Sequence, residues 1–386
     1  MTGEAAPPER PGYVLLAARL LELRPWELGE SARAVPPRTL LEHAERLAER
    51  GARPEADSEL ESKAGGARAA TDDPLRALEA RGLLEIVGGL CRLTERGRHA
   101  GTRALEAEAD RRFEELLLAC EASEAYGRLC RLVHGADLCQ LDVLDAEQLD
   151  HMVASLAPAA EGGRNRILDL GCGAGRLSEH LAAATGAEVL GIDRCAGAIR
   201  RARDRTRDRS RFRIGERDGE PASAGGRVDF REGDLRDLSG LASEPGPGWD
   251  AAVAVDTLYF LDDLDAAVAW IARLLAPGGR AAIFASELLP EGAAEEGREP
   301  EEIARCTRIA RALDRHGFTF RIRDFSAAEH ALWRRQREAA LALRKAFEAE
   351  GRLGLWRLRL SEAERTLEWV EAGRVRRYFY LAEQRS

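Results

Sequence analysis

Short apolar runs alternate with longer helical patterns through the second half of the chain. The runs predict strands at residues 166–170, 188–192, 228–232, 250–255 and 280–285. Each run is followed by a helical segment or by a turn into one, and this alternation is typical of a parallel sheet with helices on both faces. An Arg- and Gly-rich stretch, residues 201–226, interrupts the pattern and predicts a mobile surface loop.

The last part of the chain departs from this alternation. Two further strands are predicted at residues 318–325 and 375–381, and helical patterns over residues 327–350 and 361–371 lie between them. The second helical pattern contains Ser361-Glu-Ala-Glu364, which has the spacing of a capping box, and it stops before Gly373. A helical pair over residues 327–371 would rise over one end of the sheet, so we expect it to form a lid.

The strongest chemical signal follows the first predicted strand. It reads Ile167-Leu-Asp-Leu-Gly-Cys-Gly-Ala-Gly-Arg176 and opens a helix. Glycines at this position let the backbone turn sharply and let a ligand approach it closely, while the helix presents its N-terminal amides to the loop. A dinucleotide fingerprint would have a third, later glycine where Arg176 stands. Asp169 lies inside the strand, where a carboxylate suits a ligand that carries a free ammonium group.

In this pattern the chain resembles the class I S-adenosylmethionine (SAM)-dependent methyltransferases. The resemblance covers residues 166–285 and includes the ends of the second, third and fourth strands and the Pro-Gly-Gly turn before the fifth. It implies a Rossmann-like α/β fold with a seven-stranded sheet in the order 3-2-1-4-5-7-6, a helical N-terminal domain and a helical insertion between the last two strands. It also implies SAM as the cofactor. The residues implied to bind it are Asp169, Gly171, Cys172, Gly173, Gly175, Asp193, Arg194, Asp234, Leu235, Asp256 and Tyr126.

Within that set the family assigns separate roles. Asp193, at the end of the second strand, would bind the ribose hydroxyls, and Asp234, after the third, would accept a hydrogen bond from the adenine amine. Tyr126 belongs to a stretch before the sheet that resembles the cap of small-molecule methyltransferases. The candidate catalytic residues are Tyr259, in the loop after the fourth strand, Glu287, just past the fifth, and His134, a possible base from the cap.

The N-terminal part has a pattern of its own. Helical patterns over residues 13–23 and 39–50 precede a polar loop over residues 51–73. A helix ending at Gly82, a hairpin turning at Gly88 and Gly89, and a helix capped by Thr94 follow. This resembles the winged-helix module of bacterial regulators, which many methyltransferases use only for packing or dimerisation. We therefore expect a winged-helix-like domain at residues 1–120, cap helices at 121–160 and a SAM-binding catalytic domain at 161–386.

Charge narrows the choice of partner. Residues 1–150 carry 20 basic and 29 acidic side chains, whereas the rest of the chain carries 38 of each. A negative N-terminal surface repels phosphate backbones, which argues against nucleic acid as a partner and favours packing or homodimerisation for the winged-helix-like part.

The cysteines and the first residues of the chain indicate neither a metal site nor secretion. The seven cysteines form no Cys-x-x-Cys pair and have no metal-ligand spacing with histidine, so we expect reduced, mostly buried thiols and no metal. The first residues show no basic region followed by an apolar one, and no run approaches the roughly 18 apolar residues that cross a bilayer. These observations predict a cytoplasmic protein without a membrane partner.

The sequence thus predicts a SAM-dependent methyltransferase that transfers a methyl group to nitrogen, oxygen or carbon of a small molecule. The loop Asp256-Thr-Leu-Tyr259 lacks the Pro-Pro of adenine-amine DNA methyltransferases, and no Pro-Cys dipeptide suits cytosine chemistry. Two alternatives stay open at this point. One is a SAM-using enzyme of other chemistry, such as aminopropyl transfer or cyclisation, and the other is a SAM-responsive DNA-binding regulator.

Overall fold

The computed structural model describes residues 40–41, 44, 74–87, 90–139, 141–156, 165–212, 226–243, 248–261, 263–289 and 300–384. The chain divides into two compact units, Met1–Phe113 and Glu114–Ser386. The predicted helix at residues 13–23, the loop at 51–73 and the turn at Gly88 and Gly89 lie outside the described residues. Of the predicted helix at residues 39–50, positions 40, 41 and 44 are described, and all three are helical.

The described part of the first unit is a helix, a hairpin and the start of a long helix. Helix α4 (Pro74–Ala80) leads into strands β1 (Leu84–Val87) and β2 (Leu90–Leu93), which pair antiparallel. Helix α5 (Glu95–Glu121) follows, and the Thr94 hydroxyl accepts a hydrogen bond of 3.0 Å from the Gly97 amide at its start. That bond satisfies one of the amides that a helix N-terminus leaves without a partner, as the sequence predicted for Thr94.

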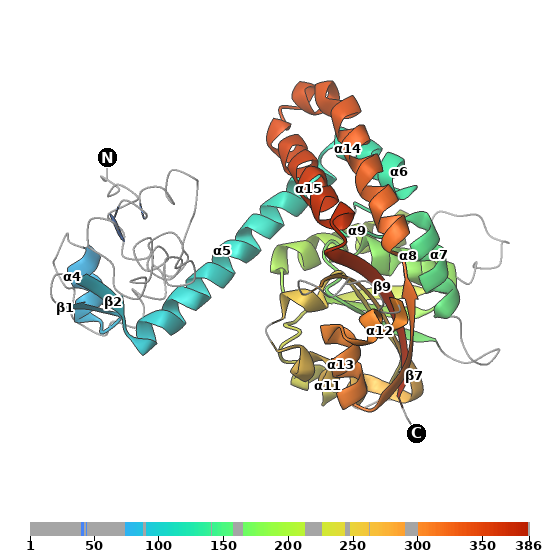
Figure 1. Ribbon diagram of the computed structural model, residues 1–386, viewed down its shortest axis with the longest axis horizontal. Coiled ribbons are helices and arrows are strands. Elements are labelled where there is room, and N and C mark those ends of the chain that lie inside the picture. Colours follow the sequence, from blue (N-terminus) through green and yellow to red (C-terminus); the bar gives the residue numbers. More distant parts are fainter. Residues whose placement is uncertain are drawn as a thin grey trace. The chain divides into compact units, whose positions relative to one another are not determined.

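A seven-stranded sheet forms the centre of the second unit (Figure 1). Its strands are β3 (Arg166–Leu170), β4 (Glu188–Asp193), β5 (Arg227–Glu232), β6 (Trp249–Val255), β7 (Leu275–Leu288), β8 (Phe318–Asp324) and β9 (Val375–Gln384). Their order is β5-β4-β3-β6-β7-β9-β8, and β9 runs antiparallel to both of its neighbours. This confirms the predicted order of strands and the Rossmann-like class.

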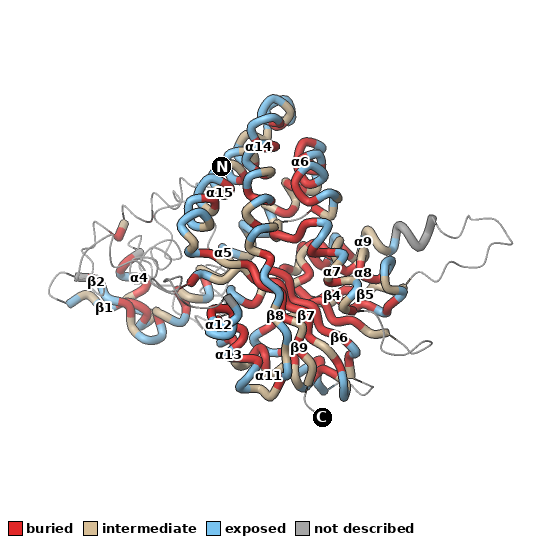
Figure 2. The backbone as a smooth tube through the Cα atoms, turned by 45° about the vertical axis from the view of Figure 1, so that its right-hand side comes forward, coloured by how far each residue is buried: buried red, intermediate tan, exposed pale blue. Residues whose placement is uncertain are grey.

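The central strands of the sheet are buried (Figure 2), because apolar side chains pack on both of its faces. On one face, α11 (Leu264–Leu274), α13 (Arg308–Arg315) and the short α10 (Ser239–Ala242) contribute to the core. On the other face, α7 (Ala146–Ser155) and α8 (Arg176–Thr185) do so. Burial on both sides explains why these strands read as continuous apolar runs rather than as alternating ones. The short helix α12 (Pro300–Arg305) lies between β7 and α13 in the chain.

Three helices make a separate core beside the sheet. They are α6 (Glu124–His134), α14 (Ser326–Ala349) and α15 (Leu353–Glu371), and they bury Tyr126, Trp333, Phe347 and Leu367 among other side chains. Figure 1 shows α14 and α15 as a hairpin with α6 beside α14. This is the predicted helical insertion between the last two strands. We call α6 and α7, with the segment between them, the cap, and α14 with α15 the lid.

Two local predictions were wrong. Ser361 does not cap a helix, because α15 begins at Leu353 and the Ser361 hydroxyl donates to the Leu358 carbonyl within it. A capping-box spacing also occurs inside helices, so the pattern alone did not locate the start. Residues 201–212 are not a loop either, since they belong to α9 (Ala196–Phe212). The rest of that predicted loop, up to residue 225, lies outside the described residues.

Candidate functional site

The glycine loop joins β3 to α8 and turns through three left-handed residues. Gly171, Gly173 and Gly175 have φ angles of 79°, 52° and 78°. A Cβ atom on Gly171 would lie 2.3 Å from the Thr257 hydroxyl, and one on Gly175 would lie 2.3 Å from the Phe230 ring. A Cβ atom on Gly173 would meet nothing within 4 Å. The outer glycines therefore let the loop pack against the protein, whereas the middle one faces open space that a ligand can approach.

Asp193, the last residue of β4, holds the loop in this shape. Its carboxylate accepts hydrogen bonds of 2.8 Å from the Gly173 amide and 2.8 Å from the Cys195 amide. Each carboxylate oxygen has a second lone pair, so the group can still accept bonds from a ligand. The Arg194 side chain beside it is exposed, while Cys172 in the loop is buried.

Asp169 is a buried carboxyl beneath the loop. It is 2% exposed, and the Ser178 hydroxyl donates a hydrogen bond of 2.5 Å to it. Burial, together with the nearby carboxylates of Asp193 and Asp142, raises the pKa of Asp169 to about 7, although the Ser178 hydrogen bond opposes this. A cation placed next to it would stabilise the charged form, so the site suits the ammonium group of SAM.

Asp234 follows β5 at the same edge of the sheet. Its carboxylate accepts hydrogen bonds from the Arg236 guanidinium at 2.5–3.1 Å, and these bonds lower the pKa of Asp234. A ligand amine would have to share that carboxylate with Arg236. The Leu235 side chain next to it is buried in the core of the sheet.

Asp256 lies in a buried ion pair that the sequence did not reveal. It follows β6 with a φ angle of 51°, and its carboxylate accepts bonds of 2.7 and 3.0 Å from the two Nη atoms of Arg377. The Val143 amide of the cap donates to the same carboxylate at 2.9 Å. Both charged side chains are buried, so each needs the opposite charge of the other to offset the cost of its removal from water.

Arg377 extends this contact into a network across three parts of the fold. Its Nε atom donates to Gln148 of the cap at 2.6 Å, and Nη1 donates to Ser286 of β7 at 3.0 Å. Ser286 in turn donates to Glu329 of the lid at 2.7 Å. Glu329 is 1% exposed, and burial raises its pKa. One arginine thus links cap, sheet and lid.

A signal for Arg377 is present in the sequence but is weak. The strand β9 begins Val375-Arg-Arg, and side chains in a strand point alternately to opposite faces. Arg376 and Arg377 therefore point to opposite faces of the sheet, and each shares its face with apolar side chains of the same strand. Nothing in the local sequence identifies its partner, because Asp256 lies 121 residues away.

The two catalytic candidates on the sheet are not brought together. Tyr259 lies in the short 3-10 helix η4 (Leu258–Phe260) after β6 and is 43% exposed; partial burial and nearby Asp256 raise its pKa. Glu287 lies next to Ser286 in β7, so it points to the opposite face. There it accepts bonds of 3.4 Å from the Ile309 amide and the Tyr380 hydroxyl, and burial raises its pKa.

His134 and Tyr126 lie on α6, in the region packed against the lid. The His134 Nδ1 atom bonds to the Leu144 carbonyl at 2.9 Å, which makes Nδ1 the protonated nitrogen, and its Nε2 atom is buried without a partner. Burial lowers the pKa of His134 to about 3, so the ring is neutral at physiological pH. Tyr126 is buried, and the Arg359 guanidinium lies 5.9 Å from its ring centre.

The described part of the chain is informative about metals and membranes. No group of three or more His, Cys, Asp or Glu side chains is arranged to hold a metal ion in that part of the chain. None of its helices is both long and apolar enough to cross a membrane.

The sheet order and the glycine loop at its carboxyl edge define a Rossmann-like nucleotide-binding enzyme. Residues 168–283 match the family model of a methyltransferase domain. A ubiquinone biosynthesis O-methyltransferase of Xanthomonas oryzae pv. oryzae is 32% identical over 206 residues, which cover 52% of this chain and 72% of the relative. The corresponding enzyme of Xanthomonas axonopodis pv. citri is 31% identical over 148 residues, which cover 38% of this chain and 52% of that relative. The chain belongs to the class I SAM-dependent methyltransferases, and SAM is the cofactor of this family.

Solved structures share the fold at low sequence identity. The phosphoethanolamine N-methyltransferase 2 of Haemonchus contortus, in complex with S-adenosylhomocysteine, has a TM-score of 0.51 and 17% identity over 71% of this chain and 60% of that chain. The cyclopropane synthase MmaA2 of Mycobacterium tuberculosis has a TM-score of 0.50 and 12% identity over 70% of this chain and 98% of that chain. At these identities the likeness concerns the fold alone.

Proposed function

We propose that the protein transfers the methyl group of SAM to nitrogen, oxygen or carbon of a small-molecule acceptor. The observation that carries the proposal is the glycine loop, in which Gly173 faces open space and Asp193 fixes the Gly173 amide at 2.8 Å. The sulfonium of SAM supplies an electrophilic methyl carbon, and the protein has to align a nucleophile with it in a site that excludes water.

The proposed cofactor site follows the carboxyl ends of β3, β4, β5 and β6. Asp169 faces the ammonium group, Asp193 the ribose hydroxyls, and Asp234 with Leu235 the adenine. The backbone of Gly171, Cys172, Gly173 and Gly175 forms the floor, and Arg194 lies at the margin. Tyr126 is fully buried in the core of α6, α14 and α15, so it supports the cap. Asp256 acts through its buried pair with Arg377, whose Nη1 lies 2.7 Å from the carboxylate, and so positions the loop after β6 rather than holding SAM by a free carboxylate.

The proposed acceptor site lies beside Tyr259, between the cap and the lid. A neutral His134 has an unprotonated Nε2 atom that can accept a hydrogen bond, but a pKa lowered to about 3 makes it a weak base, so its role is to orient the acceptor rather than to take its proton. Glu287 is the weaker candidate for a base, because it lies on the face of the sheet opposite Ser286. The name of the Xanthomonas oryzae pv. oryzae relative, an O-methyltransferase, supports oxygen as the acceptor atom.

The first unit is proposed to pack or to dimerise rather than to bind nucleic acid. A helix, a hairpin and a helix in this unit are compatible with a winged-helix-like module. Residues 1–113 carry 20 acidic and 18 basic residues, so this unit has no basic excess with which to hold a phosphate backbone, and most of the acidic excess of residues 1–150 lies in residues 114–150. On this proposal the protein is a cytoplasmic homodimer with the domain limits expected above.

Binding and product analysis test the function. Calorimetry should detect binding of SAM and of S-adenosylhomocysteine to the purified protein. Incubation with methyl-labelled SAM and a panel of phenols and amines should give S-adenosylhomocysteine and a labelled acceptor. Methylthioadenosine as the product would instead show aminopropyl transfer or cyclisation of the SAM side chain, and failure to bind either nucleoside would overturn the proposal.

The Asp193→Ala variant tests the cofactor site directly. It removes the acceptor for the Gly173 and Cys195 amides together with the proposed ribose ligand. We expect SAM affinity to fall about tenfold or more, since a hydrogen bond to a charged group is worth about 1.5–3 kcal/mol. Calorimetry measures this, and Asp150→Ala, which removes an exposed carboxylate on α7, is the matched control. Unchanged affinity in Asp193→Ala would show that the assignment is wrong.

A further inference from the structure

The last turns of α5 cover the glycine loop from outside the sheet. Glu114, Leu117 and Glu121 are spaced at i, i+3 and i+7, which places them on one face of the helix. Leu117 packs with Ala174 of the loop and with Cys195 after β4. A Cβ atom on Gly197, at the start of α9, would lie 1.6 Å from the Glu114 carboxylate, so this face of α5 fits closely against the nucleotide-binding half of the sheet.

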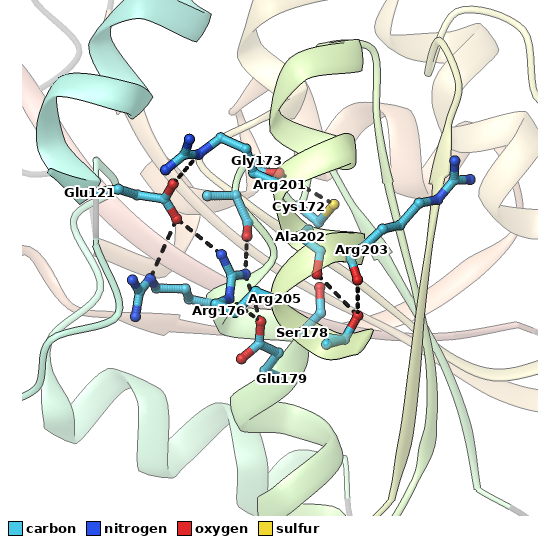
Figure 3. Close-up of polar contacts among 12 residues, drawn as sticks. Glu121, Cys172, Gly173, Arg176, Ser178, Glu179, Arg201, Ala202, Arg203 and Arg205 are labelled. Atoms are coloured by element: carbon cyan, nitrogen blue, oxygen red, sulfur yellow. Dashed lines mark hydrogen bonds and ion pairs between the residues drawn. The ribbon is translucent and has the colours of Figure 1, made fainter. Parts of the chain in front are cut away.

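Glu121 is surrounded by three guanidinium groups (Figure 3). Its side chain is 4% exposed, and its carboxylate lies 2.5 Å from Arg201 Nε, 3.0 Å from Arg205 Nη1 and 3.8 Å from Arg176 Nε. Arg176 is the first residue of α8, and the other two come from α9. One buried carboxylate therefore neutralises charge that two helices bring to the same place.

Arg205 connects this carboxylate to the loop. The same guanidinium donates to Glu121 at 3.0 Å, to Glu179 of α8 at 2.6 Å and to the carbonyl of Ala174. Ala174 stands between Gly173, which faces open space, and Gly175, which precedes α8. The Ala174 carbonyl belongs to the peptide that links Ala174 to Gly175. Arg205 therefore holds the loop after Gly173, whereas Asp193 holds it at the Gly173 amide.

We propose that Glu121 is a positioning residue for the cofactor, which orients the glycine loop through Arg205. The inference rests on the proposed binding of SAM at that loop. Without Glu121, Arg176, Arg201 and Arg205 would repel one another, and Arg205 would keep only Glu179 of its two carboxylate partners. Because Glu121 acts on the loop through Arg205, its removal should affect cofactor binding rather than the chemical step.

The Glu121→Gln variant tests this role. We expect the KM for SAM to rise about tenfold with little change in kcat, since the loop loses one of the charge-assisted contacts that hold it in the binding conformation. The Kd of S-adenosylhomocysteine, measured by calorimetry, should rise by the same factor, because a displaced loop weakens both nucleosides alike. The Glu121→Asp variant, which keeps the charge, should recover part of the affinity.

Controls separate the possible failures. Glu115→Gln removes the neighbouring exposed charge of α5 and should leave both constants unchanged. Arg205→Lys should show the same loss of affinity for SAM and S-adenosylhomocysteine, because an ammonium group lacks the planar guanidinium geometry that reaches three acceptors. If Glu121→Gln does not fold, Arg205→Lys takes its place as the test. A folded Glu121→Gln variant with unchanged affinity, or with a loss for cationic SAM alone, would overturn the positioning role. If the unaltered protein binds neither nucleoside, the proposed function fails instead.

Discussion

Gly173 differs from its two neighbouring glycines in what surrounds it. All three have positive φ angles, but only a Cβ atom on Gly173 would find nothing within 4 Å. In Gly173→Ala we expect the free energy of unfolding to fall by about 1 kcal/mol, the cost of a left-handed alanine. SAM binding should be largely lost, because the added methyl group lies where the ligand approaches. Calorimetry and urea unfolding measure the two effects.

The contrast with Gly171→Ala makes this prediction specific. There the added methyl group would lie 2.3 Å from Thr257, so the variant should lose far more stability than Gly173→Ala. Equal losses of stability in the two variants, with SAM binding retained in Gly173→Ala, would mean that the middle glycine does not face the cofactor.

Asp169 should make SAM binding depend on pH. With its pKa raised to about 7, the carboxyl is about one tenth ionised at pH 6 and about nine tenths ionised at pH 8. SAM affinity should therefore rise about tenfold over that range, because only the charged form attracts the ammonium group. Calorimetry at several pH values tests this. The Asp169→Asn variant should remove most of the pH dependence of SAM affinity. A smaller pH dependence should remain because of Asp142, whose pKa is raised to about 6.

The same group should affect folding with the opposite sign. Its pKa in the folded protein lies above the ordinary value of 3.8, so the folded state holds the proton more tightly than the unfolded chain does. Its contribution to stability therefore decreases as pH rises from about 4 to about 7. The cofactor site thus retains a carboxyl that costs stability at neutral pH, and a bound cation would offset that cost.

At the scale of elements, Arg377 connects the cap, the sheet and the lid. In Arg377→Met the buried carboxylate of Asp256 loses its counter-charge, and we expect the free energy of unfolding to fall by about 3–5 kcal/mol. Urea unfolding measures it, and Arg376→Met, on the other face of β9, is the matched control. Adding Asp256→Asn to Arg377→Met should recover much of the loss, since the carboxylate that Arg377 paired with is then replaced by a neutral amide. A single variant as stable as its control would contradict the network.

Local patterns identified most elements of the second unit, and tertiary contacts decided the rest. Strand β3 was predicted at the residues where it occurs, because a fully buried strand is a continuous apolar run. The polar part of α9 was missed, since after Ala202 it consists largely of Arg and Asp and has no apolar stripe. Among site residues, the glycine loop and Asp193 had a local pattern. Arg377, Glu329 and Glu121 had none, because distant segments supply their partners.

At the scale of the molecule, the proposed site is assembled from remote parts of the chain. The cap supplies Gln148, the parallel part of the sheet supplies Asp256 and Ser286, and the lid with the strand after it supplies Glu329 and Arg377. Composition and charge were informative about the class of partner, but they carry no information on this assembly. The sequence consequently offers local patterns for the proposed SAM site and none for the proposed acceptor site.

The insertion of β9 between β7 and β8 also bears on the order in which the protein folds. Asp256 and Arg377 are 121 residues apart, and closing a flexible loop of that length costs roughly 4 kcal/mol of chain entropy. Until β9 is in place, Asp256 has no guanidinium partner. We therefore expect the sheet and the proposed site to be completed together, late in folding, and a chain lacking that strand should remain unable to enclose an acceptor.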